Sequence, residues 1–233
     1  MKQIYLPILL AMIWPSYLTG QGLNEDLSAS VSQAISQWEN IPPDRLVLLD
    51  ELADIVREDL DQHGQTALLF VCTHNSRRSQ MAQAWAIAAS YHYGLDGVKA
   101  YSGGTEATAF NPRAVNALRG AGFRVDIATG SDSVDNPRYE VRPGKEIPAV
   151  ICFSKKYGHQ ANPSEDFIAV MVCSDADESC PLVAGADARV AIPYTDPKIS
   201  DGGPDESITY ATRSLQIASE MCYLMQQVAS ASE

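Results

Sequence analysis

The spacing of hydrophobic residues changes along the chain and divides it into segments. From residue 23 to residue 64, apolar residues recur every three to four positions, which predicts amphipathic helices. At Thr66 the pattern becomes a short continuous apolar run, residues 67–71, typical of a strand buried on both faces of a parallel sheet. The sequence therefore predicts a helical lead-in over residues 23–64, followed by a separate domain over residues 65–229.

Apolar runs and helical patterns then alternate along this domain. Strands are expected at residues 98–101, 149–153, 168–172 and 190–192, and helices at residues 79–93, 112–121 and 207–228. Strands that alternate with helices form parallel sheets through right-handed crossovers, with helices on both faces. We therefore predict an α/β fold, a three-layer sandwich with a central parallel sheet of about four strands, preceded by a helical N-terminal extension. Residues 131–147, which contain two prolines and little periodicity, are expected to be a loop.

The first 22 residues have a different character. They carry one lysine and no acidic residue, then an apolar run from Ile4 to Trp14, then small residues up to Gly22. This order is typical of a secretory signal peptide, and the run is shorter than the roughly 20 residues that span a bilayer. We expect residues 1–22 to be a signal peptide and the protein to be exported to a periplasm, without stable membrane insertion once the peptide is cleaved. A cytoplasmic location is the alternative if this segment is not a signal.

The formal net charge of -12 and the pI near 4.7 argue against a nucleic-acid partner, because phosphate neutralisation needs a basic face. An anionic ligand must therefore be held by a local pocket.

One such pocket is predicted at residues 72–78, Cys-Thr-His-Asn-Ser-Arg-Arg, between the first strand and the following helix. A loop of small polar residues can turn its N–H groups around an anion, and the helix adds its positive end. Arg78 can bind two anion oxygens with its planar fork, and this positive field favours a thiolate at Cys72. Asn75 tolerates the left-handed backbone that a tight loop requires. A cysteine and an arginine at this spacing are a weak signal alone, and their place between strand and helix strengthens it.

The other four cysteines fall into two groups. Cys152 and Cys222 stand among apolar residues and are expected to be buried. Cys173 follows the strand predicted at residues 168–172, which places it at the same sheet edge as Cys72, and a flexible polar loop would let Cys180 approach it. Such a pair suits thiol-disulfide exchange, although a static disulfide is an alternative. No metal is expected, because the spacing fits no usual zinc pattern.

Asp196 and Pro197 follow the last predicted strand, and a carboxylic acid at that edge could donate a proton to a leaving group. An Asp-Pro pair is also a common turn. Asp201 and Asp205, in a glycine-rich turn, are expected to be solvated.

Several segments together resemble the low-molecular-weight protein tyrosine phosphatase superfamily, most closely its thioredoxin-coupled arsenate reductase branch. They are residues 69–82, 101–105, 111–115, 173–181 and 194–197, and the resemblance extends roughly from Thr66 to Met225, with an insertion near residues 130–165. Two residues depart from the family pattern. His74 stands where glycine is usual, and Arg77 where the arsenate reductases usually carry another cysteine. Arg77 could strengthen anion binding, but we expect it to point to solvent.

The resemblance implies a role for each matching residue. Cys72 would be the nucleophile, Arg78 the oxyanion clamp and Asp196 the acid, while Cys173 and Cys180 would form a disulfide relay. Oxyanion binding would fall to the loop and the start of the helix, that is to Thr73, His74, Asn75, Ser76, Arg77, Arg78 and Ser79, with Ser79 also bonded to the thiolate.

The leading hypothesis is therefore arsenate reduction without a bound cofactor, with a thioredoxin-like dithiol as reductant. Phosphomonoester hydrolysis through a phosphocysteine is the second hypothesis, and a non-enzymatic oxyanion-binding or redox-sensing protein is the third. The cysteine pair favours the first hypothesis. Export favours the second, because a reducing partner is less available outside the cytoplasm.

Overall fold

The computed structural model describes residues 22–131, 133–180 and 182–230. The predicted signal peptide, residues 1–22, therefore lies outside the described residues except for Gly22. Within the described ranges, no helix is both long enough and apolar enough to cross a membrane.

The centre of the molecule is a parallel sheet of four strands in the order β2-β1-β6-β7. The strands are β1 (Thr66–Cys72), β2 (Val98–Gly104), β6 (Phe167–Met171) and β7 (Ala186–Ala191). Both faces of β1 and β6 are covered, so almost every side chain on these two strands is buried, which explains their continuous apolar sequences. The predicted α/β fold with a central parallel sheet is confirmed.

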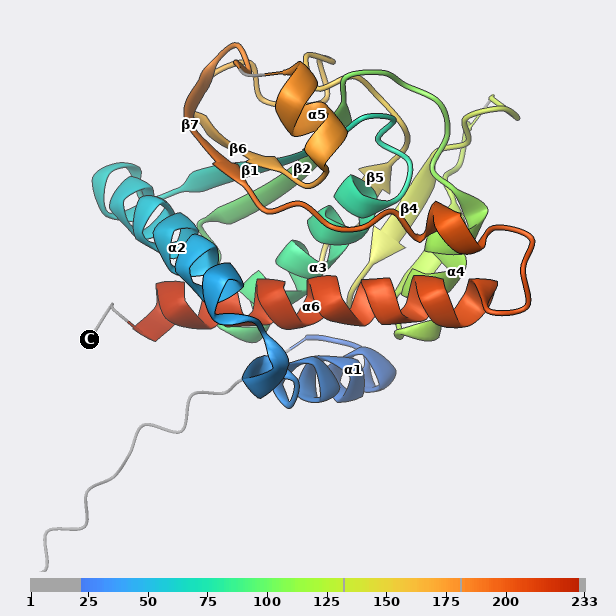
Figure 1. Ribbon diagram of the computed structural model, residues 1–233, viewed down its shortest axis with the longest axis horizontal. Coiled ribbons are helices and arrows are strands. Elements are labelled where there is room, and N and C mark those ends of the chain that lie inside the picture. The colour runs from blue at the N-terminus through green and yellow to red at the C-terminus, as the bar shows by residue number, and fades with distance from the viewer. Residues whose placement is uncertain (1–21, 132, 181, 231–233) are drawn as a thin grey trace, which may run out of the picture.

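Helices cover both faces of this sheet. α5 (Ser174–Ser179) lies above it in Figure 1, whereas α2 (Pro43–His63), α3 (Arg78–His92) and α6 (Glu206–Ser230) lie below. α4 (Pro112–Gly120) packs beside the start of α6, and it begins at Asn111, whose side chain accepts a hydrogen bond from the N–H of Arg113. A short 3-10 helix, η2 (Pro197–Ser200), precedes α6.

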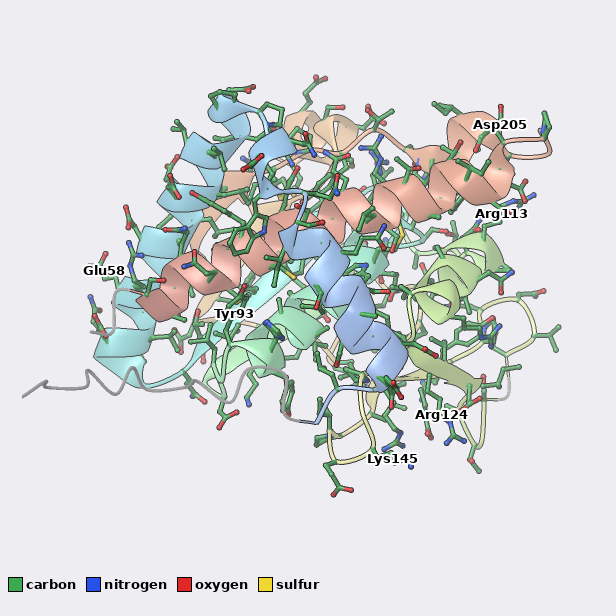
Figure 2. All side chains as sticks on the ribbon, turned by 90° about the horizontal axis from the view of Figure 1, so that it is seen from below. Glu58, Tyr93, Arg113, Arg124, Lys145 and Asp205 are labelled. Carbon is green, nitrogen blue, oxygen red and sulfur yellow. The ribbon has the colours of Figure 1, made fainter. Side chains whose placement is uncertain are left out.

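The N-terminal helices share the hydrophobic core of the rest of the chain. α1 (Glu25–Ile35) lies across α6, as Figure 2 shows, and the short η1 (Trp38–Asn40) leads into α2. Trp38 donates from Nε1 to the carbonyl oxygen of Ser219 in α6 at 3.2 Å, and Arg45 of α2 forms an ion pair with Glu220. The predicted helical extension is therefore present, and its apolar face is buried against the last helix.

A second, antiparallel sheet corrects two expectations. It contains β3 (Arg124–Ile127), β4 (Tyr139–Arg142) and β5 (Val150–Cys152) in that order. The prediction of a loop over residues 131–147 is wrong for β4, whose alternate residues are buried in the core. The strand predicted at 149–153 exists as β5, but it pairs with β4 and not with the parallel sheet.

The segment between Cys173 and Cys180 is a short helix, α5, where a flexible loop was expected. Cys173 caps this helix, because its Sγ accepts a hydrogen bond from the N–H of Ala176 at 3.3 Å. Asp175 and Asp177 lie in the first turn, where negative side chains stabilise the positive N-terminal end of a helix.

Candidate active site

The carboxyl ends of three neighbouring strands bring the predicted residues together. β1 ends at Cys72, and the chain after β6 continues beside it, since the N–H of Val172 donates to the carbonyl oxygen of Val71 at 2.8 Å. Beyond β7, the N–H of Tyr194 donates in turn to the carbonyl oxygen of Val172 at 3.1 Å. Cys72, the Cys173 segment and the Asp196 segment therefore lie at one edge of the sheet, where ligands of such folds bind.

The loop after β1 turns its carbonyl groups away from its centre. The carbonyl oxygens of residues 72–76 each accept a hydrogen bond from the surrounding frame. The donors, in order, are Thr105 N at 3.2 Å, Glu106 N at 2.8 Å, Ser154 Oγ at 2.8 Å, Gln80 Nε2 at 3.1 Å and Asn111 N at 2.9 Å. The N–H on the other side of each trans peptide points the opposite way. Among the described residues, none accepts a hydrogen bond from the N–H groups of residues 73–77. These five groups are available to an anion.

Two residues allow the loop to close this tightly. Asn75 has a φ of 46°, the left-handed conformation expected from the sequence. Gly104, at the end of β2, passes so close to the loop that an added Cβ would lie 2.7 Å from the carbonyl oxygen of Thr73 and 2.8 Å from the nitrogen of Asn75. The loop geometry thus requires the absence of a side chain at position 104.

Cys72 is 3% exposed, and its Sγ lies 3.1 Å from Ser79 Oγ. The hydrogen bonds around Asn75 determine which way that hydroxyl donates. Asn75 Oδ1 accepts from the N–H of Lys155 at 2.9 Å, so its Nδ2 faces Ser79 Oγ and donates to it at 2.9 Å. The hydroxyl of Ser79, which already accepts this bond, is free to donate its own hydrogen to the sulfur. A hydroxyl donor therefore faces the Cys72 sulfur.

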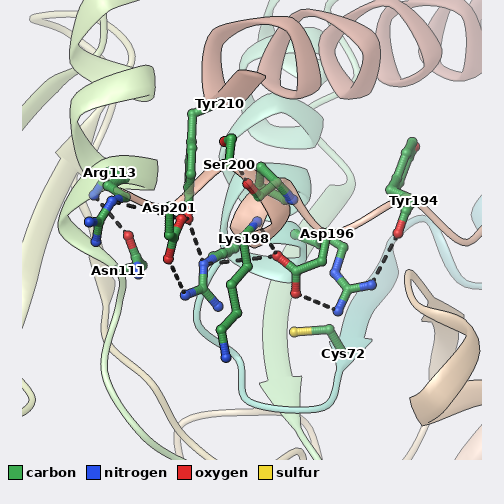
Figure 3. A network of polar contacts seen from close by, with 12 residues as sticks. Cys72, Asn111, Arg113, Tyr194, Asp196, Lys198, Ser200, Asp201 and Tyr210 are labelled. Atoms are coloured by element: carbon green, nitrogen blue, oxygen red, sulfur yellow. Dashed lines mark hydrogen bonds and ion pairs between the residues drawn. The ribbon is translucent and has the colours of Figure 1, made fainter. Parts of the chain in front are cut away.

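Arg78 begins α3 and points back over the loop. Its Nη1 donates to the carbonyl oxygen of Tyr194 at 3.0 Å, and its Nη2 forms an ion pair with Asp196 Oδ2 at 2.9 Å (Figure 3). The other oxygen of Asp196 accepts from the N–H of Lys198 at 3.0 Å and caps η2. Arg78 Nε is buried and has no partner among the described residues, so one donor of the guanidinium remains available to a ligand.

Comparison with characterised proteins agrees with this geometry. The family model for low molecular weight phosphotyrosine protein phosphatases matches residues 67–141. An arsenate reductase of Bacillus licheniformis is 32% identical over 150 residues, which are 64% of this chain and 87% of the relative. The arsenate reductase of Bacillus subtilis is 30% identical over 146 residues, or 63% of this chain and 84% of the relative. The chain belongs to the low molecular weight protein tyrosine phosphatase superfamily, within its arsenate reductase branch.

Members of both groups are enzymes, and this chain is an enzyme of one of these two types. Solved structures add less. A low molecular weight phosphotyrosine phosphatase from Vibrio cholerae covers 72% of this chain and 97% of its own, at 15% identity and a TM-score of 0.46. The family assignment rests on the sequence relatives.

Arg77, one of the two departures from the superfamily pattern, is only 12% exposed, so the expectation that it points to solvent is wrong. Its Nε donates to the hydroxyl of Tyr210 at 2.8 Å, and its Nη2 lies 3.5 Å from Asp201 Oδ2 (Figure 3). Its Nε is also 3.9 Å from Asp196 Oδ1. The Arg77 side chain therefore links residues 72–78, here called the oxyanion loop, to Asp196, to Asp201 and to Tyr210 of α6.

Asp201 is exposed as a residue, as expected, although its side chain is only 24% exposed. Its carboxylate accepts a hydrogen bond from the Tyr210 hydroxyl, 2.8 Å away. Burial, reinforced by this hydrogen bond to Asp201, raises the pKa of Tyr210 to about 12, so the hydroxyl stays neutral at ordinary pH. Arg113 of α4 lies 3.8 Å from Asp201 and extends the network.

His74, the second departure, turns its ring away from the loop. Its Nε2 lies 3.5 Å from Glu106 Oε2, and the side chain is 45% exposed. Only its backbone takes part in the loop. Of the other loop residues, Ser76 is buried, and Thr73 directs its hydroxyl towards Cys173, with 3.5 Å between Oγ1 and Sγ.

The cysteines are all described and all free thiols, so the static disulfide considered for Cys173 and Cys180 is not formed. Cys173 is fully buried, and Cys180 lies at the other end of α5, where its Sγ is 3.2 Å from the carbonyl oxygen of Leu182. Cys152 and Cys222 are buried as predicted, and loss of hydration raises the pKa of each thiol to about 12.

Some residues that build the site were missed in the sequence. Gly104 and Tyr210 carry no local signal of their roles, because their contacts come from segments distant in sequence. Ser154 and Lys155 support the loop from within the insertion, for which the family resemblance gave no counterpart. The N-cap of α5 could have been recognised, since acidic residues directly after Cys173 are typical of a helix start.

Proposed function

We propose that the protein reduces arsenate to arsenite, with Cys72, Cys173 and Cys180 acting in turn and a thioredoxin-like dithiol restoring the thiols. The observation that carries the proposal is the place of Cys173. Its sulfur lies 3.5 Å from the hydroxyl of Thr73, the residue next to the nucleophile, in the segment that follows β6, and a third thiol lies one short helix away. The relatives of Bacillus licheniformis and Bacillus subtilis, at 32% and 30% identity, are named arsenate reductases.

Oxyanion binding changes the partners of Arg78. Without a ligand, Arg78 Nη2 pairs with Asp196, whose carboxylate therefore occupies one of the donors that a bidentate arsenate complex needs. An arsenate that enters the loop replaces this carboxylate at the guanidinium and also reaches the free Nε and the five N–H groups. Asp196, released from the ion pair, is then free to carry a proton towards the leaving oxygen.

The Cys72 thiolate attacks arsenic and forms an S–As bond, while one arsenate oxygen leaves as water with the proton from Asp196. Cys173 then attacks the Cys72 sulfur. The S–As bond breaks with its electron pair on arsenic, which leaves as arsenite, and a Cys72–Cys173 disulfide forms. The two thiols thus supply the two electrons of the reduction.

Cys180 completes the relay by attacking Cys173, which returns the Cys72 thiolate and forms a Cys173–Cys180 disulfide. The six residues of α5 lie between Cys173 and Cys180, and seven steps of the helical rise separate their Cα atoms by roughly 10 Å, more than the roughly 7 Å that a disulfide allows. α5 must therefore uncoil in this step. A helix of six residues is marginal alone, so uncoiling costs little.

Phosphomonoester hydrolysis is the second candidate, and one observation favours it. Cys173 is fully buried and serves as the N-cap of α5, which is a structural role that needs no redox chemistry. A phosphatase would use only Cys72, Arg78 and Asp196, with water releasing the phosphate, and α5 would remain intact.

Both activities can be measured on one purified sample, with p-nitrophenyl phosphate as the ester and arsenate with excess dithiol as the alternative. The proposal predicts arsenate turnover that Cys173→Ser abolishes while ester hydrolysis is kept. Cys152→Ala, a buried cysteine outside the relay, is the matched control and should retain both activities. Ester hydrolysis without any arsenate reduction would establish the phosphatase instead.

A further inference from the structure

A cavity of about 630 Å³ lies between α3, β2 and residues 148–162 of the insertion, away from the oxyanion loop. Its walls are partly apolar, with Ile87, Leu95 and Val150 among the lining residues, and partly aromatic, with Tyr91 and Phe153. A cavity of this size and character is typical of small-molecule sites. Neither arsenate nor a phosphate group needs such a volume of apolar surface.

Lys155 gives this cavity a buried positive charge. The residue is 4% exposed and lines the cavity, and its Nζ lies 4.9 Å from the centroid of the Phe153 ring. Among the described residues, this ammonium has neither a carboxylate partner nor a hydrogen-bond acceptor. Loss of hydration lowers the pKa of Lys155, which is the expected response of a buried cation without a counter-ion.

Other polar and aromatic groups lie around the same Phe153 ring. The guanidinium of Arg138 also lies 4.9 Å from the Phe153 ring, and the ring of His159 lies 5.4 Å from it. Asn162 Oδ1 is buried without a donor among the described residues. Asp96 is the one acidic residue among the described lining residues, and it is exposed. The cavity therefore offers unpaired positive charge and an unpaired acceptor.

We propose that this cavity binds a small organic anion with an apolar body, whose carboxylate, sulfonate or phosphate pairs with Lys155. Arg138 adds a second positive charge at the mouth of the cavity, and a hydroxyl or amine of the ligand can donate to Asn162. The apolar body takes the place of water against the Phe153 and Tyr91 rings, where burial of apolar surface stabilises the complex.

The residues that would contact this ligand also support the oxyanion loop. The carbonyl oxygen of Phe153 accepts from Gln80 Nε2 at 2.9 Å, and the N–H of Lys155 donates to Asn75 at 2.9 Å. The hydroxyl of Ser154 between them holds the carbonyl of His74. A ligand that shifts the Phe153 and Lys155 side chains therefore acts on the loop through their backbone, and each ligand alters the affinity of the other.

The test uses 8-anilinonaphthalene-1-sulfonate, an aromatic sulfonate, titrated into the full chain and followed by fluorescence and calorimetry. We expect one equivalent to bind, and Lys155→Met to weaken binding by about tenfold or more, since a charged hydrogen bond contributes about 1.5–3 kcal/mol. Lys156→Met is the matched control, because Lys156 is the exposed neighbour and does not line the cavity. It should bind the probe as the unaltered chain does.

Two further measurements keep the result decisive if Lys155→Met folds poorly. Arg138→Gln, an exposed position, should also weaken binding, and N-phenyl-1-naphthylamine, which lacks the sulfonate, should bind more weakly than the probe. Inorganic phosphate should not compete with the probe for the cavity, because phosphate occupies the oxyanion loop. The apparent affinity of the probe should therefore reach a constant value as the loop saturates with phosphate. Equal affinity in all variants, binding of several equivalents, or full competitive displacement by phosphate would each overturn the proposal.

Discussion

Replacing Arg77 by methionine tests whether this arginine positions the Asp196 segment. Methionine keeps the length of the side chain and removes its charge and donors. The substitution breaks the hydrogen bond to Tyr210 at 2.8 Å and the ion pair with Asp201 at 3.5 Å. It leaves the N–H groups of the loop and the Arg78 guanidinium in place.

The loss of folding free energy depends on the contacts that remain in the variant. A hydrogen bond to a charged group contributes about 1.5–3 kcal/mol, and Asp201 keeps the Tyr210 hydroxyl and a nearby Arg113, which favours the lower end. A loss of about 1.5–2 kcal/mol lowers the Tm of a chain of this size by about 3–8 °C. Asp196 loses a cation 3.9 Å away, and displacement of a catalytic group by about 1 Å costs up to about 10²-fold in rate.

The assay compares kcat and KM for an aryl phosphate with a poor leaving group and for one with a good leaving group. The positioning role predicts that Arg77→Met lowers kcat about tenfold or more for the poor leaving group, with a smaller loss for the good one. Tyr210→Phe should have a smaller effect of the same kind, and the two substitutions should be non-additive. A large rise in KM with unchanged kcat would show instead that Arg77 binds the oxyanion, and the reasoning from its contacts would be refuted.

Three other outcomes follow from the site and the core. Gly104→Ala should abolish activity and phosphate binding, measured by calorimetry, because its Cβ would lie 2.8 Å from the nitrogen of Asn75; a normal affinity would show that the loop tolerates the side chain. Asp196→Asn should slow the chemical step by about 10² to 10⁴-fold for poor leaving groups, and an unchanged rate would assign the acid elsewhere. The pKa of Cys152 and that of Cys222 are raised from 9.0 to about 12 in the folded state, so the unfolded chain loses these protons first. The free energy of unfolding, measured in urea, should therefore fall as pH rises above about 9, and it should fall less steeply with pH in Cys222→Ala. The same dependence on pH in both proteins would contradict the burial argument.

The sequence predicted those parts of the fold whose pattern depends on burial alone. β1 and β6 are covered on both faces, and their continuous apolar runs showed it. β3 and β4 have four residues each. β3 buries one residue and β4 buries alternate residues, so their patterns are too short to separate from a loop. β5 was recognised as a strand, but its pairing with β4 depends on the path of the insertion, which no local pattern records.

The site divides in the same way. The positions of Cys72, Arg78 and Asp196 follow from the ends of strands, and strand ends could be found in the sequence. The direction of the Arg77 side chain could not be predicted, because its partners Tyr210 and Asp201 lie more than a hundred residues away along the chain. Polarity alone suggested that Arg77 points to solvent, and its contacts with Tyr210 and Asp201 made that expectation wrong.

Mass spectrometry of Cys180→Ser after exposure to arsenate tests the central claim most directly. Without the resolving thiol, the relay predicts about one equivalent of arsenite and a protein trapped with a Cys72–Cys173 disulfide. Cys173→Ser, treated in parallel, should release no arsenite and form no such bond. A Cys180→Ser protein that turns over arsenate repeatedly, or that carries no Cys72–Cys173 bond after exposure, would contradict the relay and the proposed reduction.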